Sequence, residues 1–154
     1  MAKIMNKLLT VSKVGNSVTL EIQGYESNET KNWNEDNWLS CKAQLYIGRW
    51  NFDFPFSCFT TDLSEFSKDM EALKDGVRNL TAFVPLEPDL QFEISYISSG
   101  EYRLILTSEC KVRRDCEFNS SLSLALILTF EEVCLLADQA ANCSAMFPQR
   151  GMRR

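Results

Sequence analysis

The chain has 154 residues, of which 45% are hydrophobic and 24% charged, proportions that are typical of a soluble globular protein. This length predicts a single domain over residues 1–154, with an ordered body at about 5–148 and a basic tail at 149–154. The sequence contains no histidine, and its two closest glycines, Gly15 and Gly24, lie nine positions apart. Catalytic or metal sites that need histidine, and glycine-rich phosphate loops, are therefore excluded.

Acidic charge is concentrated in the body of the chain. The formal net charge is −5, but all 21 acids lie within residues 8–149, where only 11 basic residues accompany them, giving this stretch a net charge of −10. The other five basic residues are Lys3, Lys7, Arg150, Arg153 and Arg154. This distribution disfavours nucleic-acid binding, because phosphate contacts need clustered Lys and Arg, and it suits a basic protein partner. The alternative is that the charge serves solubility alone.

The sequence predicts neither a membrane span nor an export signal. The longest apolar stretch, Leu122–Leu128, is too short to cross a bilayer. Residues 1–7 lack the apolar block and the small-residue cleavage site of a signal peptide. We therefore expect a cytoplasmic protein with no membrane contact.

The six cysteines predict neither a disulfide scaffold nor a metal site. No Cys-x-x-Cys pair occurs, and the chain is too long and too apolar for a disulfide-stabilised secreted domain. Cys41 and Cys58 fall on apolar strand faces and are expected in the core. Cys110 and Cys116 flank a turn and could meet across a hairpin, although a reduced pair is favoured. We expect no metal and no cofactor.

Alternating apolar and polar residues predict four strands in the first part of the chain. These strands lie at about residues 7–12, 18–23, 39–47 and 52–58. A polar loop at 26–37 separates the second strand from the third. Pro55 cannot donate a hydrogen bond to a neighbouring strand, so it predicts an edge position or a bulge in the fourth.

The spacing of apolar residues then changes to that of a helix. Five of them follow one another at intervals of three and four: Leu63, Phe66, Met70, Leu73 and Val77. This spacing predicts an amphipathic helix that ends near Gly76, and Asp62 with Glu65 resembles a capping box at its start. Further alternation predicts strands at about 80–84, 90–96, 102–106 and 122–128.

A second helix completes the predicted order. Thr129 and Glu132 have the spacing of a capping box, and the helix that they begin ends before Pro148. The element order is then ββββαββββα, and the short hairpin connections favour antiparallel pairing. The predicted fold class is α+β, mainly antiparallel β with about eight strands and two α-helices. Whether the strands form one curved sheet or two packed sheets is left open.

The polar loop and its borders combine aromatic and acidic residues. Because aromatic side chains anchor protein interfaces, seven residues are candidates for binding a partner. They are Tyr25, Glu26, Glu29, Trp33, Glu35, Asp36 and Trp38. The alternative is structural, with Trp38 covering the core and Asp36 or Asn37 bonding the backbone of the turn.

Two other charged clusters are weaker candidates. Glu87, Asp89 and Glu93 could raise one another's pKa for acid–base chemistry, but Asp89 and Glu93 would stand about 13 Å apart along a strand. A solvated strand face is therefore favoured. The cations of Lys111–Arg114 could bind a phosphate, but flanking acids cancel their charge, which favours a soluble hairpin tip. No catalytic residue is predicted.

Five short segments, in this order, resemble the WapI-type immunity protein family. They are Gly24–Glu26, Asp36–Leu39, Gly48–Trp50, the Thr61-x-Leu63-x-Glu65 helix start and Leu86–Glu93. The resemblance spans about residues 18–93 and continues more loosely to Pro148. It implies a bacterial, cytoplasmic protein that protects its cell from the C-terminal toxin domain of a large contact-delivered protein. The toxin of the type member is a nuclease that cuts tRNA.

The resulting hypothesis is an antitoxin, not an enzyme. It would bind the basic surface of a cognate toxin, which the resemblance implies is a nuclease, and neutralise it by stoichiometric occlusion. One alternative is a carboxylate-dependent hydrolase that uses Glu87 or Glu93 in a pocket. Another is a regulatory interaction module without a toxin partner.

Overall fold

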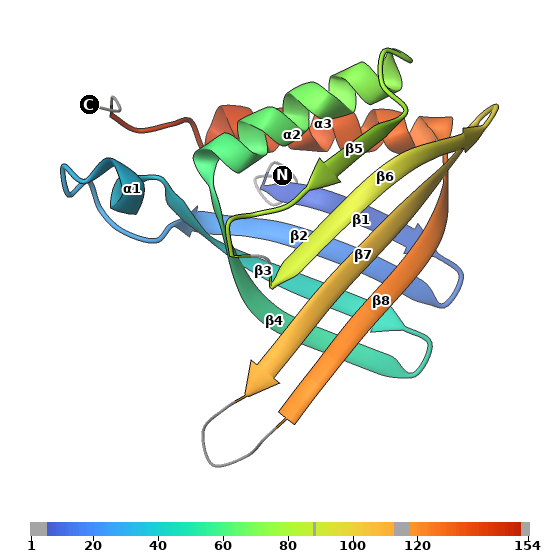
Figure 1. Ribbon diagram of the computed structural model, residues 1–154, viewed down its shortest axis with the longest axis horizontal. Coiled ribbons are helices and arrows are strands. Elements are labelled where there is room, and N and C mark those ends of the chain that lie inside the picture. The colour runs from blue at the N-terminus through green and yellow to red at the C-terminus, as the bar shows by residue number, and fades with distance from the viewer. Residues whose placement is uncertain (1–5, 88, 113–117, 152–154) are drawn as a thin grey trace.

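The strands form two separate antiparallel sheets. The computed structural model describes residues 6–87, 89–112 and 118–151 (Figure 1). The first sheet has the order β1-β2-β3-β4 and consists of β1 (Lys7–Lys13), β2 (Asn16–Tyr25), β3 (Trp38–Ile47) and β4 (Trp50–Phe59). The second has the order β5-β6-β7-β8 and consists of β5 (Leu80–Phe83), β6 (Leu90–Ser98), β7 (Glu101–Val112) and β8 (Phe118–Thr129). The predicted α+β class and order are confirmed, and the open choice is decided in favour of two sheets.

Three helices accompany the sheets. They are α1 (Trp33–Asp36), α2 (Thr60–Lys74) and α3 (Phe130–Met146). Figure 1 shows α2 and α3 side by side across one side of the two sheets, with α1 set apart at one end of the molecule. The short α1 lies in the segment predicted as a polar loop, and four residues are too few to show an apolar period. Among the described residues, no helix has the length and apolar content needed to span a membrane.

The core lies between the helices and the inner faces of both sheets. Alternate residues of β2 are fully buried, as the strand pattern predicts. The helix residues Leu63, Phe66, Met70 and Leu73 are buried too, whereas Val77 is exposed, because α2 ends before Gly76 and the chain turns away. Phe66 joins α2 to the second sheet by edge-on ring contacts with Phe83 and Phe92. Burial of these large rings supplies much of the driving force for packing.

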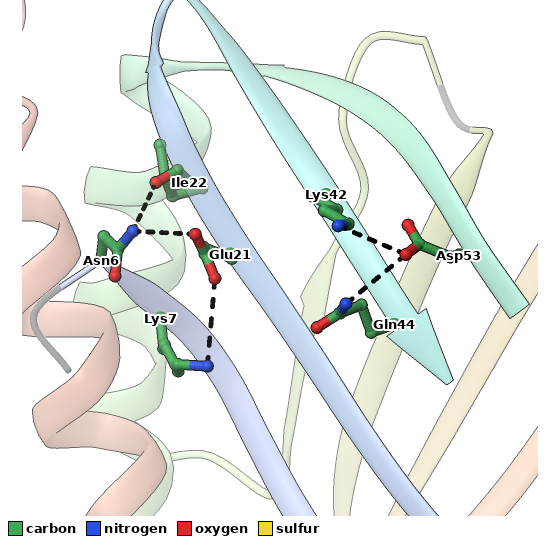
Figure 2. A network of polar contacts seen from close by, with 7 residues as sticks. All are labelled: Asn6, Lys7, Glu21, Ile22, Lys42, Gln44 and Asp53. Atoms are coloured by element: carbon green, nitrogen blue, oxygen red, sulfur yellow. Dashed lines mark hydrogen bonds and ion pairs between the residues drawn. The ribbon is translucent and has the colours of Figure 1, made fainter. Parts of the chain in front are cut away.

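The outer face of the first sheet is polar and neutralises its own charges. Figure 2 shows the Lys7–Glu21 pair at 3.9 Å and the Lys42–Asp53 pair at 3.3 Å. Pro55 lies on the exposed side of β4, which is an edge strand whose pairing with β3 has a continuous register. The edge position predicted from Pro55 is therefore confirmed, without a bulge.

The two predicted capping boxes have different outcomes. At α3 the box is confirmed: the Glu132 carboxylate accepts from the Thr129 N–H at 2.7 Å, and the Glu132 N–H donates to the Thr129 hydroxyl at 3.2 Å. At α2 the predicted box of Asp62 and Glu65 is wrong. The helix begins at Thr60, and Asp62 in its first turn accepts from the Phe59 N–H at 2.7 Å.

Some predictions concern side chains outside the described part of the chain. The possible Cys110–Cys116 contact and the cations of Lys111–Arg114 both lie there. Cys41 and Cys58 are described, and both are fully buried, as predicted.

Candidate functional site

The loop between β2 and β3 is held by a buried carboxylate. Asp36, the last residue of α1, is 6% exposed, and its Oδ1 accepts from the Thr30 N–H at 2.6 Å and from the Thr30 hydroxyl at 2.9 Å. The backbone hydrogen bond from Thr30 is the main cause that lowers the pKa of Asp36. The carboxylate therefore stays ionised and fixes the loop that carries α1.

Asn37 joins this loop to two distant segments. Its side-chain oxygen accepts from the Thr60 hydroxyl at 2.9 Å and from the Arg150 N–H at 2.8 Å. Its amide nitrogen donates to the carbonyls of Trp33 at 2.7 Å and Arg150 at 2.9 Å. Asn37 is fully buried, so these bonds supply partners for polar groups that water does not reach.

The segment after α3 packs against the same loop. The Tyr25 hydroxyl donates to the Pro148 carbonyl at 2.6 Å, and the Tyr25 ring meets Phe147 edge-on. The Arg150 guanidinium lies 3.4 Å from the centre of the Tyr25 ring and donates to the Ser27 carbonyl at 3.2 Å. Arg150, which the sequence analysis places in the basic tail, is therefore held by partners far away in the sequence.

Three aromatic rings form a stack beside α1. Trp38 lies 3.9 Å from Phe59 between ring centres, and Trp33 lies 6.4 Å from Phe59 on a nearly parallel plane. Trp38 and Phe59 face each other because they are register partners at one end of β3 and β4. The two tryptophans are only partly buried, so part of the stack remains open to solvent.

The stack forms one wall of a shallow groove of about 610 Å³. Its lining residues are Trp33, Asn34, Trp38, Phe59, Thr61, Asp62, Glu65, Val84 and Leu86. Val84 and Leu86, which line the groove from the segment after β5, are 58% and 71% exposed, although Pro85 between them is buried. Buried Pro85 anchors the segment that displays these two apolar side chains. Concave apolar surfaces with a few polar groups are typical binding sites.

Acidic side chains border this groove. Glu65 is exposed in the first turns of α2, and Asp62 lies one turn before it. Burial raises the pKa of Asp62, the hydrogen bond from Phe59 opposes that rise, and the charge of Glu65 adds to it. Glu29 and Glu35, in the loop and in α1, are exposed at the same end of the molecule. Lys31 is an exposed cation in this loop.

The ion pairs of the described residues lie elsewhere. They are Lys7–Glu21, Lys13–Glu132, Lys42–Asp53, Lys74–Glu71 and Arg78–Asp69. Within the described ranges, none of these pairs includes Asp62, Glu65, Glu29 or Glu35. The negative charge at the groove is therefore less compensated than the charge on the outer face of the first sheet.

The seven predicted binding residues separate into three groups. Tyr25 and Asp36 hold the C-terminal segment and the loop, as the structural alternative for Asp36 and Asn37 describes. Trp33 and Trp38 line the groove, and the remaining three are exposed acids: Glu26, Glu29 and Glu35. The Glu26 carboxylate accepts from the Ser57 hydroxyl at 2.6 Å.

Seven of the nine residues that line the groove are absent from those seven candidates. Phe59, Asp62 and Leu86 come from three segments whose local patterns indicate a strand end, a helix start and a turn. The sequence feature that could have located these residues is the ordered series of family motifs. Trp38, Glu65 and Leu86, from three of its five segments, line one groove, and the Glu26 N–H donates to the Trp38 carbonyl.

The cluster of Glu87, Asp89 and Glu93 does not form a paired-carboxylate site. Glu93 lines a separate hollow of about 260 Å³ on the second sheet, with Ala82, Val84, Gln91, Phe92, Ile105 and Thr107. Glu93 is the one carboxylate among these lining residues, and Glu87 and Asp89 are exposed outside the hollow. Within the part of the chain that the structure describes, no group of three or more Cys, Asp or Glu residues could hold a metal ion.

Comparison with known proteins identifies the family. A search of curated proteins finds no significant match. The model of the immunity protein WapI-like family matches residues 9–140. This range includes α1, α2, most of α3, β2 to β8, and all of β1 except its first two residues. The resemblance found in the sequence motifs is thereby confirmed. The chain belongs to the WapI-like immunity protein family.

Proposed function

We propose that this protein neutralises a contact-delivered bacterial toxin with nuclease activity by binding its toxin domain and covering the surface that holds the nucleic acid. Family membership supports the immunity role. The observation that carries the mode of action is the aromatic groove bordered by acids that belong to none of the ion pairs found among the described residues. A nuclease must present cations to phosphates, and an acidic partner of complementary shape can occupy those cations.

Such inhibition requires binding energy and no chemical step. Aromatic side chains commonly anchor the centre of a strong interface, and polar groups form its rim. The acids then increase the rate of encounter with a basic surface and orient the two proteins. We further propose that the protein acts in the cytoplasm, where the nucleic acid attacked by such a toxin is found.

The direct test mixes the purified protein with the toxin domain encoded beside its gene. We expect a 1:1 complex by gel filtration and calorimetry, and nuclease activity that falls in proportion to added protein and vanishes at one equivalent. Absence of a complex would reject the proposal. A complex that leaves nuclease activity unchanged would reject occlusion of the substrate surface.

The salt dependence of binding tests the electrostatic part of the proposal. Between 50 mM and 500 mM salt we expect the association rate constant to fall roughly tenfold or more, with a smaller change in the dissociation rate constant. Stopped-flow mixing measures both. The variant Glu101→Lys serves as the control for a change of charge away from the groove. Glu101 begins β7, at the hairpin that Figure 1 shows at the opposite end from α1. An association rate constant that does not change with salt concentration would contradict electrostatic steering by the acids at the groove.

A further inference from the structure

We propose that the groove between the Trp33–Phe59–Trp38 stack and the Val84–Leu86 segment receives an arginine of the toxin, together with a neighbouring apolar side chain. This inference rests on the proposed function and names the part of the partner that the groove fits. The groove volume of about 610 Å³ accommodates a few side chains, not a whole domain. The occupant is therefore a projecting loop or helix end.

The aromatic wall favours a planar cation. The rings of Trp33, Phe59 and Trp38 are nearly parallel, with interplanar angles of 18° and 28° to Phe59. A guanidinium group stacks on such rings and is more weakly hydrated than an ammonium group. The same molecule contains an example of this contact, because Arg150 lies over the Tyr25 ring at 3.4 Å.

The polar border supplies the opposite charge. Asp62 and Glu65 line the groove from the start of α2, and one Asp62 oxygen already accepts from the Phe59 N–H. Glu65 is exposed and belongs to none of the ion pairs found among the described residues. An arginine donates several N–H groups in a fixed planar arrangement, so it can contact a carboxylate while its plane lies on a ring.

The Val84–Leu86 segment of the groove lining explains the apolar neighbour. Val84 and Leu86 expose more than half of their surface, and buried Pro85 fixes the backbone between them. Covering these side chains removes apolar surface from water and excludes water from the charged contact. A partner segment that offered a cation alone would leave these side chains uncovered.

Two matched pairs of variants test the position of the site. Glu65→Lys and Leu86→Asp change the groove, whereas Glu101→Lys and Ile97→Asp make the same kinds of change at exposed residues near the β6–β7 hairpin. Affinity for the toxin domain is measured by calorimetry after circular dichroism has shown that each variant is folded. We expect each groove variant to weaken binding about thirtyfold or more, as at an interface hot spot, and each control to change it less than about threefold.

Fluorine NMR of labelled tryptophans detects binding at the groove through their chemical shifts. The chain has three tryptophans, and Trp50 lies at the opposite end of the β3–β4 pair from Trp38. In a Trp50→Phe variant labelled with 5-fluorotryptophan, the two remaining signals come from Trp33 and Trp38, which both line the groove. Both signals are expected to shift when unlabelled toxin domain is added.

An exchange of charges identifies the arginine. Each surface arginine of the toxin domain is replaced in turn, and the one that enters the groove should lose affinity as Arg→Lys as well as Arg→Glu. Combining its Arg→Glu variant with Glu65→Lys should recover at least tenfold of the lost affinity, because the two charges are again opposite.

The outcomes separate this inference from the proposed function. If the toxin domain binds but the fluorine signals stay in place and the groove variants bind normally, the groove inference is wrong and the immunity function stands. If the groove variants lose affinity but no arginine responds, the assignment of an arginine is wrong. If no complex forms with the unmodified protein, both the function and its binding site are rejected.

Discussion

At the level of single residues, one buried amide connects three segments at the groove end of the molecule. Asn37 bonds to Trp33 in α1, to Thr60 at the start of α2, and to both backbone groups of Arg150. An amide suits this position because it offers an acceptor on one side and a donor on the other. The neighbouring Asp36 has only acceptors when ionised, and it faces an N–H and a hydroxyl instead.

The substitution Asn37→Asp tests this assignment with almost no change in shape. The new oxygen would replace the N–H donors and face the carbonyl oxygens of Trp33 and Arg150. We expect the free energy of unfolding to fall by about 2–4 kcal/mol, because a buried charge meets acceptors in place of donors. Urea denaturation at pH 7 measures the loss. Asn51→Asp, at an exposed position on β4, is the control, and equal losses in the two variants would contradict the role given to Asn37.

At the level of elements, the helices are attached to the sheets by polar contacts at their ends as well as by their apolar faces. The Glu132 carboxylate caps α3 by accepting from the Thr129 N–H. It also forms an ion pair with Lys13 of β1, whose ammonium nitrogen lies 2.6 Å from each carboxylate oxygen. Burial alone raises the pKa of Glu132, but the hydrogen bonds from Lys13 and Thr129 outweigh it, so the pKa is lowered. The carboxylate therefore stabilises the folded state when it is ionised.

Replacing Glu132 by Gln should lower the free energy of unfolding by about 1–2 kcal/mol at pH 7. Because the folded-state pKa lies below the ordinary value of 4.5, this contribution is complete above that value and disappears as the pH falls through the lowered pKa. The two proteins should therefore converge in stability as the pH falls through the lowered pKa. Chemical denaturation as a function of pH makes the comparison, with exposed Glu131→Gln as the control. A difference that grows at low pH would refute the ionised cap.

At the level of the whole molecule, three thiols lie in the core where the first sheet meets α3. Cys41 and Cys58 come from adjacent strands with their sulfur atoms 3.6 Å apart, and Cys143 of α3 is also fully buried. Burial raises the pKa of Cys143 to about 12, helped by the nearby Cys41. The hydrogen bond with Cys41, together with burial, raises the pKa of Cys58 as well. The thiols of Cys58 and Cys143 are therefore protonated at neutral pH, and burial protects all three from reagents in solution.

Thiol labelling tests this packing. In a Cys110→Ser/Cys116→Ser background, only Cys134 and the three buried thiols remain, and Cys134 is partly exposed. With iodoacetamide at pH 8 we expect Cys134 to react first, and the other three to react at least about a hundredfold more slowly until the protein unfolds. Mass spectrometry of peptides from timed samples follows each site. Rapid labelling of Cys41 or Cys58 in the folded protein would show that the core is more open than the structure indicates.

The local pattern of side chains was sufficient to predict most elements. Alternation identified every strand to within a few residues, except that β7 and β8 extend further towards the loop between them. Spacing of three and four identified α2 and α3, and Thr129 marked the start of α3 correctly. The start of α2 was misplaced because Thr60, Thr61 and Asp62 can all cap a helix. In the structure the N-cap is Phe59, and the Thr60 hydroxyl bonds to distant Asn37.

The sequence by itself determined which residues face the core, which face water, and the order of strands and helices, because these depend on periods of two and 3.6 residues along the chain. It also carried the motifs of the family. Only the tertiary structure decided that the strands divide into two sheets, that Arg150 packs on Tyr25, and that Trp38, Glu65 and Leu86 share one groove. Those features depend on contacts between segments far apart in the chain, where a local period contains no information on which faces will meet.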